Sequence, residues 1–145
     1  ELLELIDYSD ELGNVGEPRL VLLEKGDVIG GILLEPQNSW VLDGKKTIEP
    51  YFEYKFDIFI KRNKRNKGYS KILINAMIKD FVENFPDAEQ IRGEVINKIL
   101  EKTLQDKFPF SCDNDNEESN MYCYLSKKDA IEYLKKLKAE IVGNK

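Results

Sequence analysis

The chain has 145 residues, of which 41% are hydrophobic and 34% are charged, as is typical of one charge-rich globular domain. The absence of histidine excludes Ser-His-Asp and Cys-His relays, and the formal net charge of -5 disfavours bulk binding to nucleic acid. No apolar run approaches the roughly 18 residues that span a bilayer, and no signal-peptide pattern is visible. We therefore expect a single cytoplasmic domain over residues 1–145, with no membrane or nucleic-acid partner. Because the chain begins at Glu1 rather than at a methionine, truncation at the N-terminus stays open.

The two cysteines, Cys112 and Cys123, flank a polar stretch that can form a closed hairpin. In a chain without an export signal we expect reduced thiols there rather than a disulfide. Two cysteines without histidine do not supply a four-ligand zinc site, so we expect no metal. Any general base must then be a carboxylate, a tyrosine, a lysine or water.

The N-terminal half is predicted to be mainly strands. The short apolar-acidic segment Leu2–Tyr8 is expected to be the end of a helix. Two apolar runs on either side of a Lys-Gly-Asp turn predict a hairpin, and Gly30-Gly31 indicates a bulge or a close backbone approach. A long run of aromatic and β-branched residues predicts a further strand. The expected strands are Leu20–Glu24, Val28–Leu34 and Ile48–Ile60, with loops at Pro36–Trp40 and Asp43-Gly44, and with Phe52, Tyr54, Phe56, Ile58 and Ile60 on one face of the last strand.

The C-terminal half is predicted to alternate helices and strands, which gives a mixed α/β or α+β domain with a central sheet. An amphipathic helix follows Gly68 and ends before Pro86. Asn97 opens a second helix, and Ser126 caps a third with Asp129 in the capping-box position. The expected strands are Ile91–Ile96, a short strand after Phe108-Pro109-Phe110, and Met121–Leu125, with an acidic loop at Asp113–Asn120. The buried stripes of the three helices are expected at Ile72, Leu73, Ala76, Met77, Phe81 and Phe85, at Ile99, Leu100, Leu104 and Phe108, and at Ala130, Ile131, Leu134, Leu137 and Ile141.

The segment from Ile58 to Leu73 carries the clearest chemical signal, because a strand, a basic loop and a glycine lead directly into a helix. The first turn of a helix presents unpaired N–H groups and a positive dipole end. A glycine lets several N–H groups converge on one anion, and Lys64, Arg65 and Lys67 add positive charge. A diphosphate suits such a turn, although a solvated basic loop explains the segment about equally well. The segment fits neither a P-loop nor a Rossmann fingerprint.

The order of motifs from about Leu20 to Leu125 resembles the GNAT superfamily of acetyl-CoA-dependent N-acetyltransferases. Its signature loop is Arg or Gln, two residues, Gly, one residue, then Gly or Ala, and Arg65-x-x-Gly68-x-Ser70 is similar to it with Ser in the last place. The loop follows the hydrophobic strand end Asp57–Ile60, as in the family. Some thirty residues later, Val95-Ile96-Asn97 followed by a helix that ends at Phe108 resembles the second family motif.

The resemblance implies a mixed, mostly antiparallel central sheet with helices on both faces. It implies acetyl-CoA as acyl donor, bound in a V-shaped split between the fourth and fifth strands. The pantetheine arm and thioester would then pair with backbone groups of the fourth strand, and the pyrophosphate would bind the turn at the helix start with help from Arg65. Asn97 would contact pantetheine, although a plain helix N-cap explains this residue equally well. The implied cofactor-binding residues are Ile58, Phe59, Ile60, Arg65, Asn66, Lys67, Gly68, Tyr69, Ser70, Lys71 and Asn97.

The implied reaction is direct attack of a primary amine on the thioester, with a base or water to take the proton of the amine. Glu53, Asp57 and Glu94 are the candidate bases, because they are carboxylates on the two strands that would part. Many family members carry a Tyr that protonates the departing thiolate, and Leu104 stands at that position. Tyr122, Tyr124 or solvent could replace it.

The acceptor is expected to be a small-molecule or peptide amine. The acidic stretch from Asp113 to Glu118 would attract a cationic amine, or it is simply a solvated loop. One alternative is a catalytically silent GNAT fold that acts as a CoA-binding or interaction module. Another is a nucleic-acid module, because the basic run Lys61–Lys67 lies beside Phe59 and Tyr69. The sequence leaves open whether the protein is a monomer or a homodimer.

Overall fold

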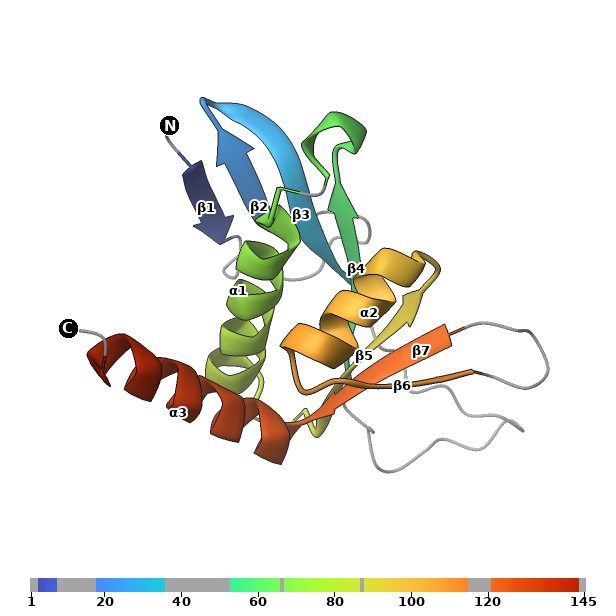
Figure 1. The fold of residues 1–145 in the computed structure, drawn as a ribbon, viewed down its shortest axis with the longest axis vertical. Coiled ribbons are helices and arrows are strands. Elements are labelled where there is room, and N and C mark those ends of the chain that lie inside the picture. The colour runs from blue at the N-terminus through green and yellow to red at the C-terminus, as the bar shows by residue number, and fades with distance from the viewer. Residues whose placement is uncertain are drawn as a thin grey trace.

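The computed structural model describes residues 3–7, 18–35, 53–65, 67–86, 88–114 and 121–143. These residues form strands, three α-helices and one short 3-10 helix (Figure 1). The strands are β1 (Leu3–Asp7), β2 (Pro18–Glu24), β3 (Asp27–Glu35), β4 (Glu53–Ile60), β5 (Gln90–Val95), β6 (Ser111–Asn114) and β7 (Met121–Ser126). The helices are η1 (Arg62–Lys64), α1 (Tyr69–Asn84), α2 (Lys98–Lys107) and α3 (Lys127–Gly143).

The strands form one mixed sheet in the order β1-β2-β3-β4-β5-β7-β6. The β4–β5 pair is parallel, and the other described pairs are antiparallel. A parallel pair needs a crossover connection, and α1 supplies it between β4 and β5. The prediction of a mixed, mostly antiparallel central sheet is therefore confirmed.

The N-terminal segment corrects one prediction, because Leu3–Asp7 is an edge strand rather than the end of a helix. It pairs antiparallel with β2 from Leu3 opposite Glu24 to Asp7 opposite Leu20. Five residues are too few for a stable isolated helix, whereas the free edge of β2 offers them a ladder of hydrogen bonds. The predicted start of the long strand at Ile48 and its residue Phe52 lie outside the described residues.

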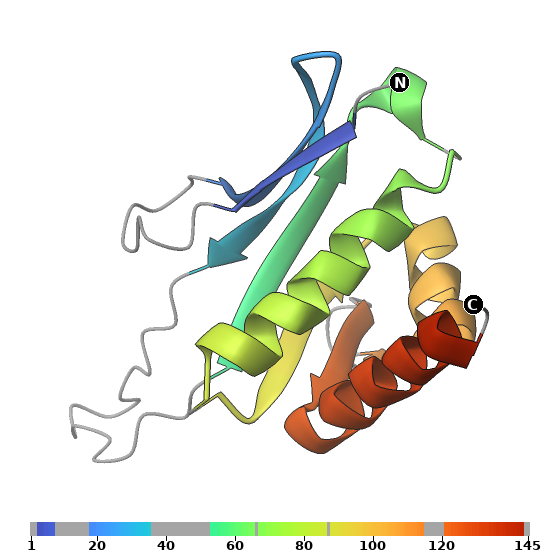
Figure 2. The same ribbon diagram turned by 90° about the vertical axis from the view of Figure 1, so that its left-hand side faces the viewer.

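The three described α-helices all pack on the same face of the sheet, which Figure 2 shows from the side. The ring of Tyr54 on β4 contacts Phe81 and Phe85 of α1, with centroids 5.9 and 4.9 Å apart. On the same side, Phe108 at the end of α2 contacts Tyr133 of α3 at 5.6 Å. The family resemblance implies helices on both faces. Within the described ranges the opposite face carries none, and we call it the open face. No described helix is long and apolar enough to cross a bilayer.

Each predicted helical stripe contains one residue that is exposed in the structure. Ile72 on α1 is 38% exposed, Ile99 on α2 is 64% exposed and Ile141 on α3 is 59% exposed. The stripe of α1 is rotated toward Ile74 and Ile78, which are fully buried. The period of the hydrophobic residues along a helix locates its buried stripe only to within one residue. Packing against the sheet decides which of the neighbouring residues is buried.

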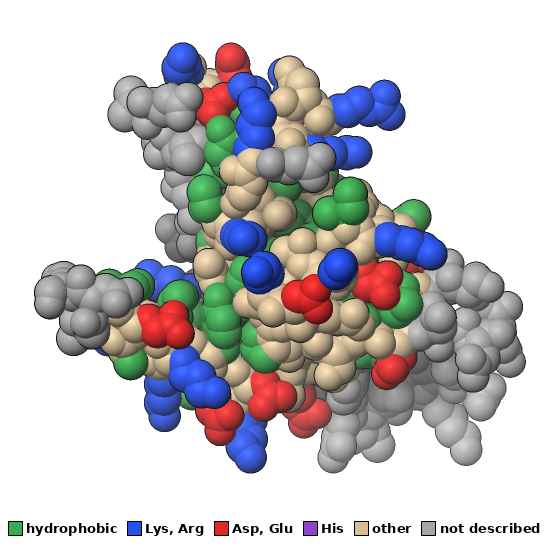
Figure 3. Space-filling view, in the orientation of Figure 1, with side chains coloured by type: hydrophobic (Ala, Val, Ile, Leu, Met, Phe, Trp, Pro, Cys, Tyr) green, Lys and Arg blue, Asp and Glu red, His purple; other side chains and the backbone are tan. Residues whose placement is uncertain are grey.

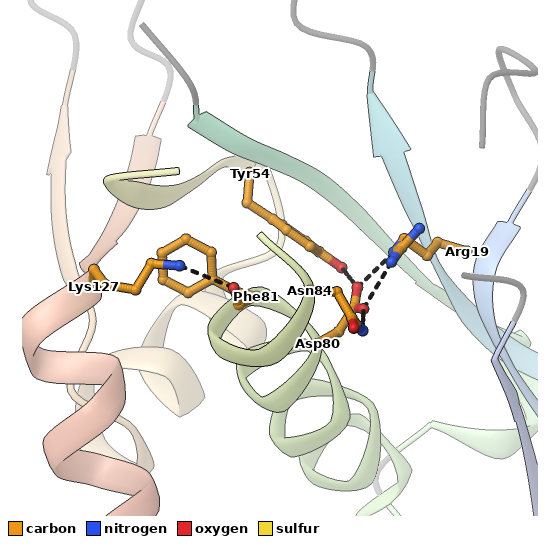
Figure 4. A network of polar contacts seen from close by, with 6 residues as sticks. All are labelled: Arg19, Tyr54, Asp80, Phe81, Asn84 and Lys127. Atoms are coloured by element: carbon orange, nitrogen blue, oxygen red, sulfur yellow. Dashed lines mark hydrogen bonds and ion pairs between the residues drawn. The ribbon is translucent and has the colours of Figure 1, made fainter. Parts of the chain in front are cut away.

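A buried network around an ion pair joins α1 to two strands, and no local pattern predicts it (Figure 4). Asp80 of α1 accepts from Nε and Nη2 of Arg19 on β2, at 2.6 and 2.9 Å. It also accepts from the hydroxyl of Tyr54 on β4 at 2.7 Å and from the amide of Asn84 at 2.8 Å. Burial, then the charge of Asp80, raises the pKa of Tyr54 well above its usual value, so the hydroxyl stays a donor. Asp80 thus fixes how α1 lies across the sheet.

The start of α3 binds the end of α1 through hydrogen bonds. The ammonium group of Lys127 donates to the carbonyls of Phe81 and Phe85, at 3.0 and 2.5 Å, and lies 3.8 Å from the centroid of the Phe81 ring (Figure 4). A cation is favourable at the negative end of a helix. Ser126 caps α3, because its hydroxyl accepts from the N–H of Asp129 at 3.1 Å, as the sequence predicted.

The expectation of reduced thiols is wrong in this structure, because Cys112 and Cys123 form a disulfide. The two residues are direct partners in the β6–β7 register, with Cα atoms 4.1 Å apart. An export signal bears on whether a protein reaches a compartment that favours disulfides. The distance between these two sulfurs depends instead on cross-strand pairing, which brings them together.

Removing the Asp80 carboxylate should be strongly destabilising. Asp80→Ala leaves the guanidinium of Arg19 and the hydroxyl of Tyr54 buried without this acceptor, which should lower the free energy of unfolding by about 3–5 kcal/mol. Asn84→Ala removes only a neutral donor to the same carboxylate and should lower it by about 1 kcal/mol. Urea unfolding measures both values, and equal losses in the two variants would contradict a central role for Asp80.

Reduction of the disulfide should lower the free energy of unfolding by about 2–3 kcal/mol, because the unfolded chain regains the entropy of an open loop. Urea unfolding with and without a reductant measures the difference, with the Cys112→Ala, Cys123→Ala double variant as the reductant-insensitive control. Two titratable thiols in the unreduced, unfolded protein would show that the bond does not form.

Candidate functional site

The candidate site begins where β4 and β5 part from one another. Among the described residues, the two parallel strands pair from Glu53 opposite Gln90 to Lys55 opposite Arg92. Beyond that point β4 continues to Ile60 along β3, and β5 continues to Val95 along β7. The two strands diverge visibly in Figure 1. Ligands of open α/β sheets bind at the carboxyl ends of parallel strands, and both carboxyl ends lie at this gap.

An aromatic ring lies against the backbone at the point of divergence. Phe56 is the first residue of β4 beyond the paired section, and Gly93 is its counterpart on β5. A Cβ atom on Gly93 would lie 2.5 Å from Cε1 of Phe56, so only glycine leaves room for the ring. Phe110, just before β6, contacts the same ring at 6.3 Å between centroids. Phe56 therefore fills the base of the gap on the helical side.

The edge of β4 that faces the gap offers backbone hydrogen-bonding groups. The N–H of Lys61 donates to the carbonyl of Ile29 at 2.7 Å, so Lys61 and, by alternation, Phe59 direct their polar backbone groups toward β3. Ile58 and Ile60 therefore direct theirs toward β5. The carbonyl of Ile60 accepts from Nε of Arg65 at 3.1 Å, which places this side chain at the end of the gap.

The start of α1 lies beyond the end of β4 and can bind an anion. Gly68 is the N-cap with φ 83° and ψ 3°, and it provides no side-chain cap for the helix. Lys71 N–H donates to the Gly68 carbonyl at 3.2 Å, whereas Tyr69 and Ser70 precede any intrahelical acceptor. The first turn holds no acidic residue. Its N–H groups and the dipole of α1 therefore favour a bound phosphate.

Positive side chains surround this turn. Arg65, Lys67 and Lys71 are exposed, as are Lys61 and Arg62 just before them. Figure 3 shows Lys and Arg side chains gathered at the end of the molecule that carries η1 and the start of α1. Ser70 is half-buried, and Asn66, another predicted phosphate ligand, lies outside the described residues.

Asn97 is the N-cap of α2, on the other side of the gap. Its Oδ1 accepts from the N–H groups of Ile99 and Leu100, at 2.8 and 3.3 Å. The capping interpretation is thereby confirmed. The cap uses only the oxygen, so the side-chain amide can still donate to a ligand, and the role at pantetheine stays a prediction.

Three of the predicted catalytic residues lie in one row on the open face. Glu94 is the register partner of Tyr122. Asp57 and Glu94 each stand two residues beyond the last β4–β5 pair, so they flank the gap on the same face of the sheet. Both carboxylates are exposed, and Tyr122 is half-buried. Asp113 on β6, which also partners Tyr122, extends the row with a third exposed carboxylate.

The other two predicted catalytic residues are less well placed. Tyr124 belongs to the next row, where it partners Arg92. Glu53 begins β4 opposite Gln90, at the closed end of the paired section. Sequence reasoning missed Arg92, whose guanidinium carbon lies 4.6 Å from the ring centroid of Tyr122 and 5.9 Å from that of Tyr124. In the sequence, Arg92 is recognisable only as a charged residue that alternates with buried neighbours on β5.

Leu104 and Tyr69 bear on two further predictions, the missing general acid and the nucleic-acid alternative. Leu104, at the position where the family often has a tyrosine, is fully buried in the core. Tyr69 packs against the core and donates its hydroxyl to Glu24 of β2. A stacking platform for bases needs exposed rings, and Tyr69 is therefore a poor one for the nucleic-acid alternative.

No protein-family model and no curated protein sequence matches the chain. Solved structures do match it. N-acetyltransferase PseH from Campylobacter jejuni in complex with acetyl coenzyme A is 21% identical over 74% of this chain and 65% of its own, with a TM-score of 0.53. The GNAT domain of S. lividans PAT is 14% identical over 74% of this chain and 58% of its own, with a TM-score of 0.58. A spermidine N-acetyltransferase SpeG chimera from Vibrio cholerae and hSSAT is 17% identical over 78% and 67%, with a TM-score of 0.59.

The described sheet, its parted central strands and these similarities define the class of structure. The chain has the GNAT fold, as the motifs around Gly68 and Asn97 predicted. It spans 65% of the length of the Campylobacter jejuni protein and 58% of that of the S. lividans domain.

A side chain at Gly93 should disturb the base of the gap. Gly93→Ala places a Cβ against the Phe56 ring and should lower the free energy of unfolding by about 1–3 kcal/mol. Adding Phe56→Leu, which removes the ring, should restore part of the loss, so the two changes should be non-additive in a double-mutant cycle measured by urea unfolding. Full additivity would mean that the ring does not require Gly93.

Proposed function

We propose that this protein is an N-acetyltransferase, which transfers an acetyl group from acetyl-CoA to a primary amine. The observation that carries the proposal is the divergence of β4 from β5 directly beside the glycine-capped start of α1. This arrangement combines an anion site with a strand edge that can pair with an extended amide-containing ligand. Acetyl-CoA has both features, a diphosphate and a pantetheine arm with two amides. The fold shared with acetyltransferases, one of them in complex with acetyl coenzyme A, supports the same ligand.

The cofactor would be held from its phosphates to its thioester by three groups of residues. The N–H groups at the start of α1, with Arg65, Lys67 and Lys71, would bind the diphosphate. The gap-facing backbone groups of Ile58 and Ile60 would pair with the pantetheine arm. The side-chain amide of Asn97 would donate to the same arm from the β5 side.

The reaction would be direct attack at the thioester. The amine nitrogen forms a bond to the carbonyl carbon, and a backbone N–H on the free edge of β4 stabilises the oxyanion. The C–S bond then breaks, which gives the amide and the CoA thiolate. One proton of the amine must leave, and the thiolate must gain one.

Asp57 and Glu94 are the stronger candidates for the base, because they flank the gap on the open face, whereas Glu53 lies at its closed end. Tyr122 shares their row and is the better placed of the two tyrosines as a proton donor. Water could replace any of these groups, because Asp57 and Glu94 are exposed.

The acceptor would approach from the open face, since the described helices cover the other one. Three carboxylates, those of Asp57, Glu94 and Asp113, line this approach and would favour a cationic amine. The SpeG chimera, a spermidine N-acetyltransferase of the same fold, makes polyamines a reasonable first choice for screening.

Calorimetric titration of acetyl-CoA into the protein and its Gly68→Asp variant tests the cofactor site. The aspartate adds a negative charge and a side chain at φ 83°, so affinity should fall at least tenfold. Gly26→Asp is a matched control, because Gly26 has φ 85° and equally open space around its Cβ but lies in the β2–β3 turn. It should leave the affinity within about twofold.

Loss of affinity in the Gly68 variant alone would support the site, and an amine panel would then identify the acceptor. No binding by the folded wild-type protein would refute the proposal. Binding without turnover on a broad amine panel would instead leave a CoA-binding module.

A further inference from the structure

A single carboxylate on β2 contacts both ends of the turn that precedes α1. Oε1 of Glu24 accepts from the ammonium group of Lys64, the last residue of η1, at 2.5 Å. Its Oε2 accepts from the hydroxyl of Tyr69, the first residue of α1. The turn between these contacts includes Arg65, Lys67 and Gly68. Glu24 is therefore the link that ties this turn to the end of the β2–β3 hairpin.

Glu24 is well placed to act as a rigid anchor. Its side chain is 10% exposed, and it belongs to β2, which pairs on both sides with neighbouring strands. Hydrogen bonds from Lys64, then from Tyr69, lower the pKa of Glu24 below its usual value, so the carboxylate is ionised at neutral pH. Short-range backbone bonds, such as that from the Lys64 N–H to the Lys61 carbonyl at 2.8 Å, also shape the turn.

We propose that Glu24 is a positioning residue for the phosphate-binding turn: by holding Lys64 and Tyr69, it keeps the N–H groups at the start of α1 directed at the diphosphate. This inference rests on the proposed binding of acetyl-CoA. Glu24 does not touch the ligand. It also pairs with the Lys64 ammonium group, so the proposal assigns phosphate binding to backbone groups and to Arg65, Lys67 and Lys71.

A purely electrostatic effect of Glu24 and a positioning role predict opposite changes in the affinity for acetyl-CoA when Glu24 is replaced. Glu24→Gln keeps the size of the side chain but removes a negative charge near an anion site, which by charge alone should tighten binding of acetyl-CoA. It also weakens the hold on Lys64 and Tyr69, and a loosened turn must be ordered when the ligand binds, which weakens binding. The positioning role predicts that weakening prevails.

The experiment compares Glu24→Gln, Tyr69→Phe and the wild type by calorimetry with two probes, acetyl-CoA and S-acetylpantetheine, which lacks the phosphates. Tyr69→Phe removes one contact to Glu24 without any change of charge. Both variants should raise the Kd for acetyl-CoA about three- to tenfold, as expected for a lost hydrogen bond, and should leave that for S-acetylpantetheine unchanged. Tyr133→Phe is the matched control, because it removes a hydroxyl that donates to Asn75 at 2.6 Å, away from the turn.

The combined Glu24→Gln, Tyr69→Phe variant should bind acetyl-CoA no more weakly than the weaker single variant, since both changes break the same link. Unchanged or tighter acetyl-CoA binding by Glu24→Gln would overturn the inference, as would equal losses for the two probes. Failure of the wild type to bind acetyl-CoA is a different result, because it refutes the proposed function itself.

Discussion

The whole site depends on the separation of two parallel strands in the middle of the sheet. After three paired positions, β4 and β5 follow different outer neighbours, and the Phe56 ring over Gly93 fills the base of the gap. A gap in a sheet leaves backbone groups without partners, which is unfavourable unless water or a ligand satisfies them. The same gap gives the protein a strand edge in its centre rather than at its border. It also joins the helical side, where the proposed phosphate-binding turn lies, to the open face, where Asp57 and Glu94 lie.

The helices hold this arrangement from one side. Asp80 links α1 to β2 and β4 through Arg19 and Tyr54, and Lys127 links the end of α1 to α3. A buried ion pair has a large desolvation cost, so its value lies in fixing one geometry as much as in stability. Its consequence is that the N-terminal end of α1 has a defined position relative to the end of β4, where Glu24 adds a second attachment.

Much of the fold could be predicted from local patterns, because alternation on β4 and the glycine before α1 are encoded within a few residues. The same segment predicts the phosphate-binding turn, whose role stays a prediction. Long-range pairings could not be predicted in this way. Neither the contact of Arg19 with Asp80, 61 residues apart, nor the pairing of Glu94 with Tyr122 leaves a local signal. The strand at Leu3–Asp7 and the disulfide were missed for the same reason, since each depends on which strand lies alongside.

In the proposed complex, one ligand occupies both the gap and the turn. Amide hydrogen exchange of the protein with and without saturating acetyl-CoA tests it most directly, because the proposed contacts are backbone N–H groups. We expect acetyl-CoA to slow exchange at Ile58, at Ile60 and at the start of α1 from Gly68 to Ser70. Adenosine 3′,5′-bisphosphate, which carries no pantetheine arm, should leave Ile58 and Ile60 unprotected. Protection by acetyl-CoA confined to other strands, or absent from both the gap and the turn, would contradict it.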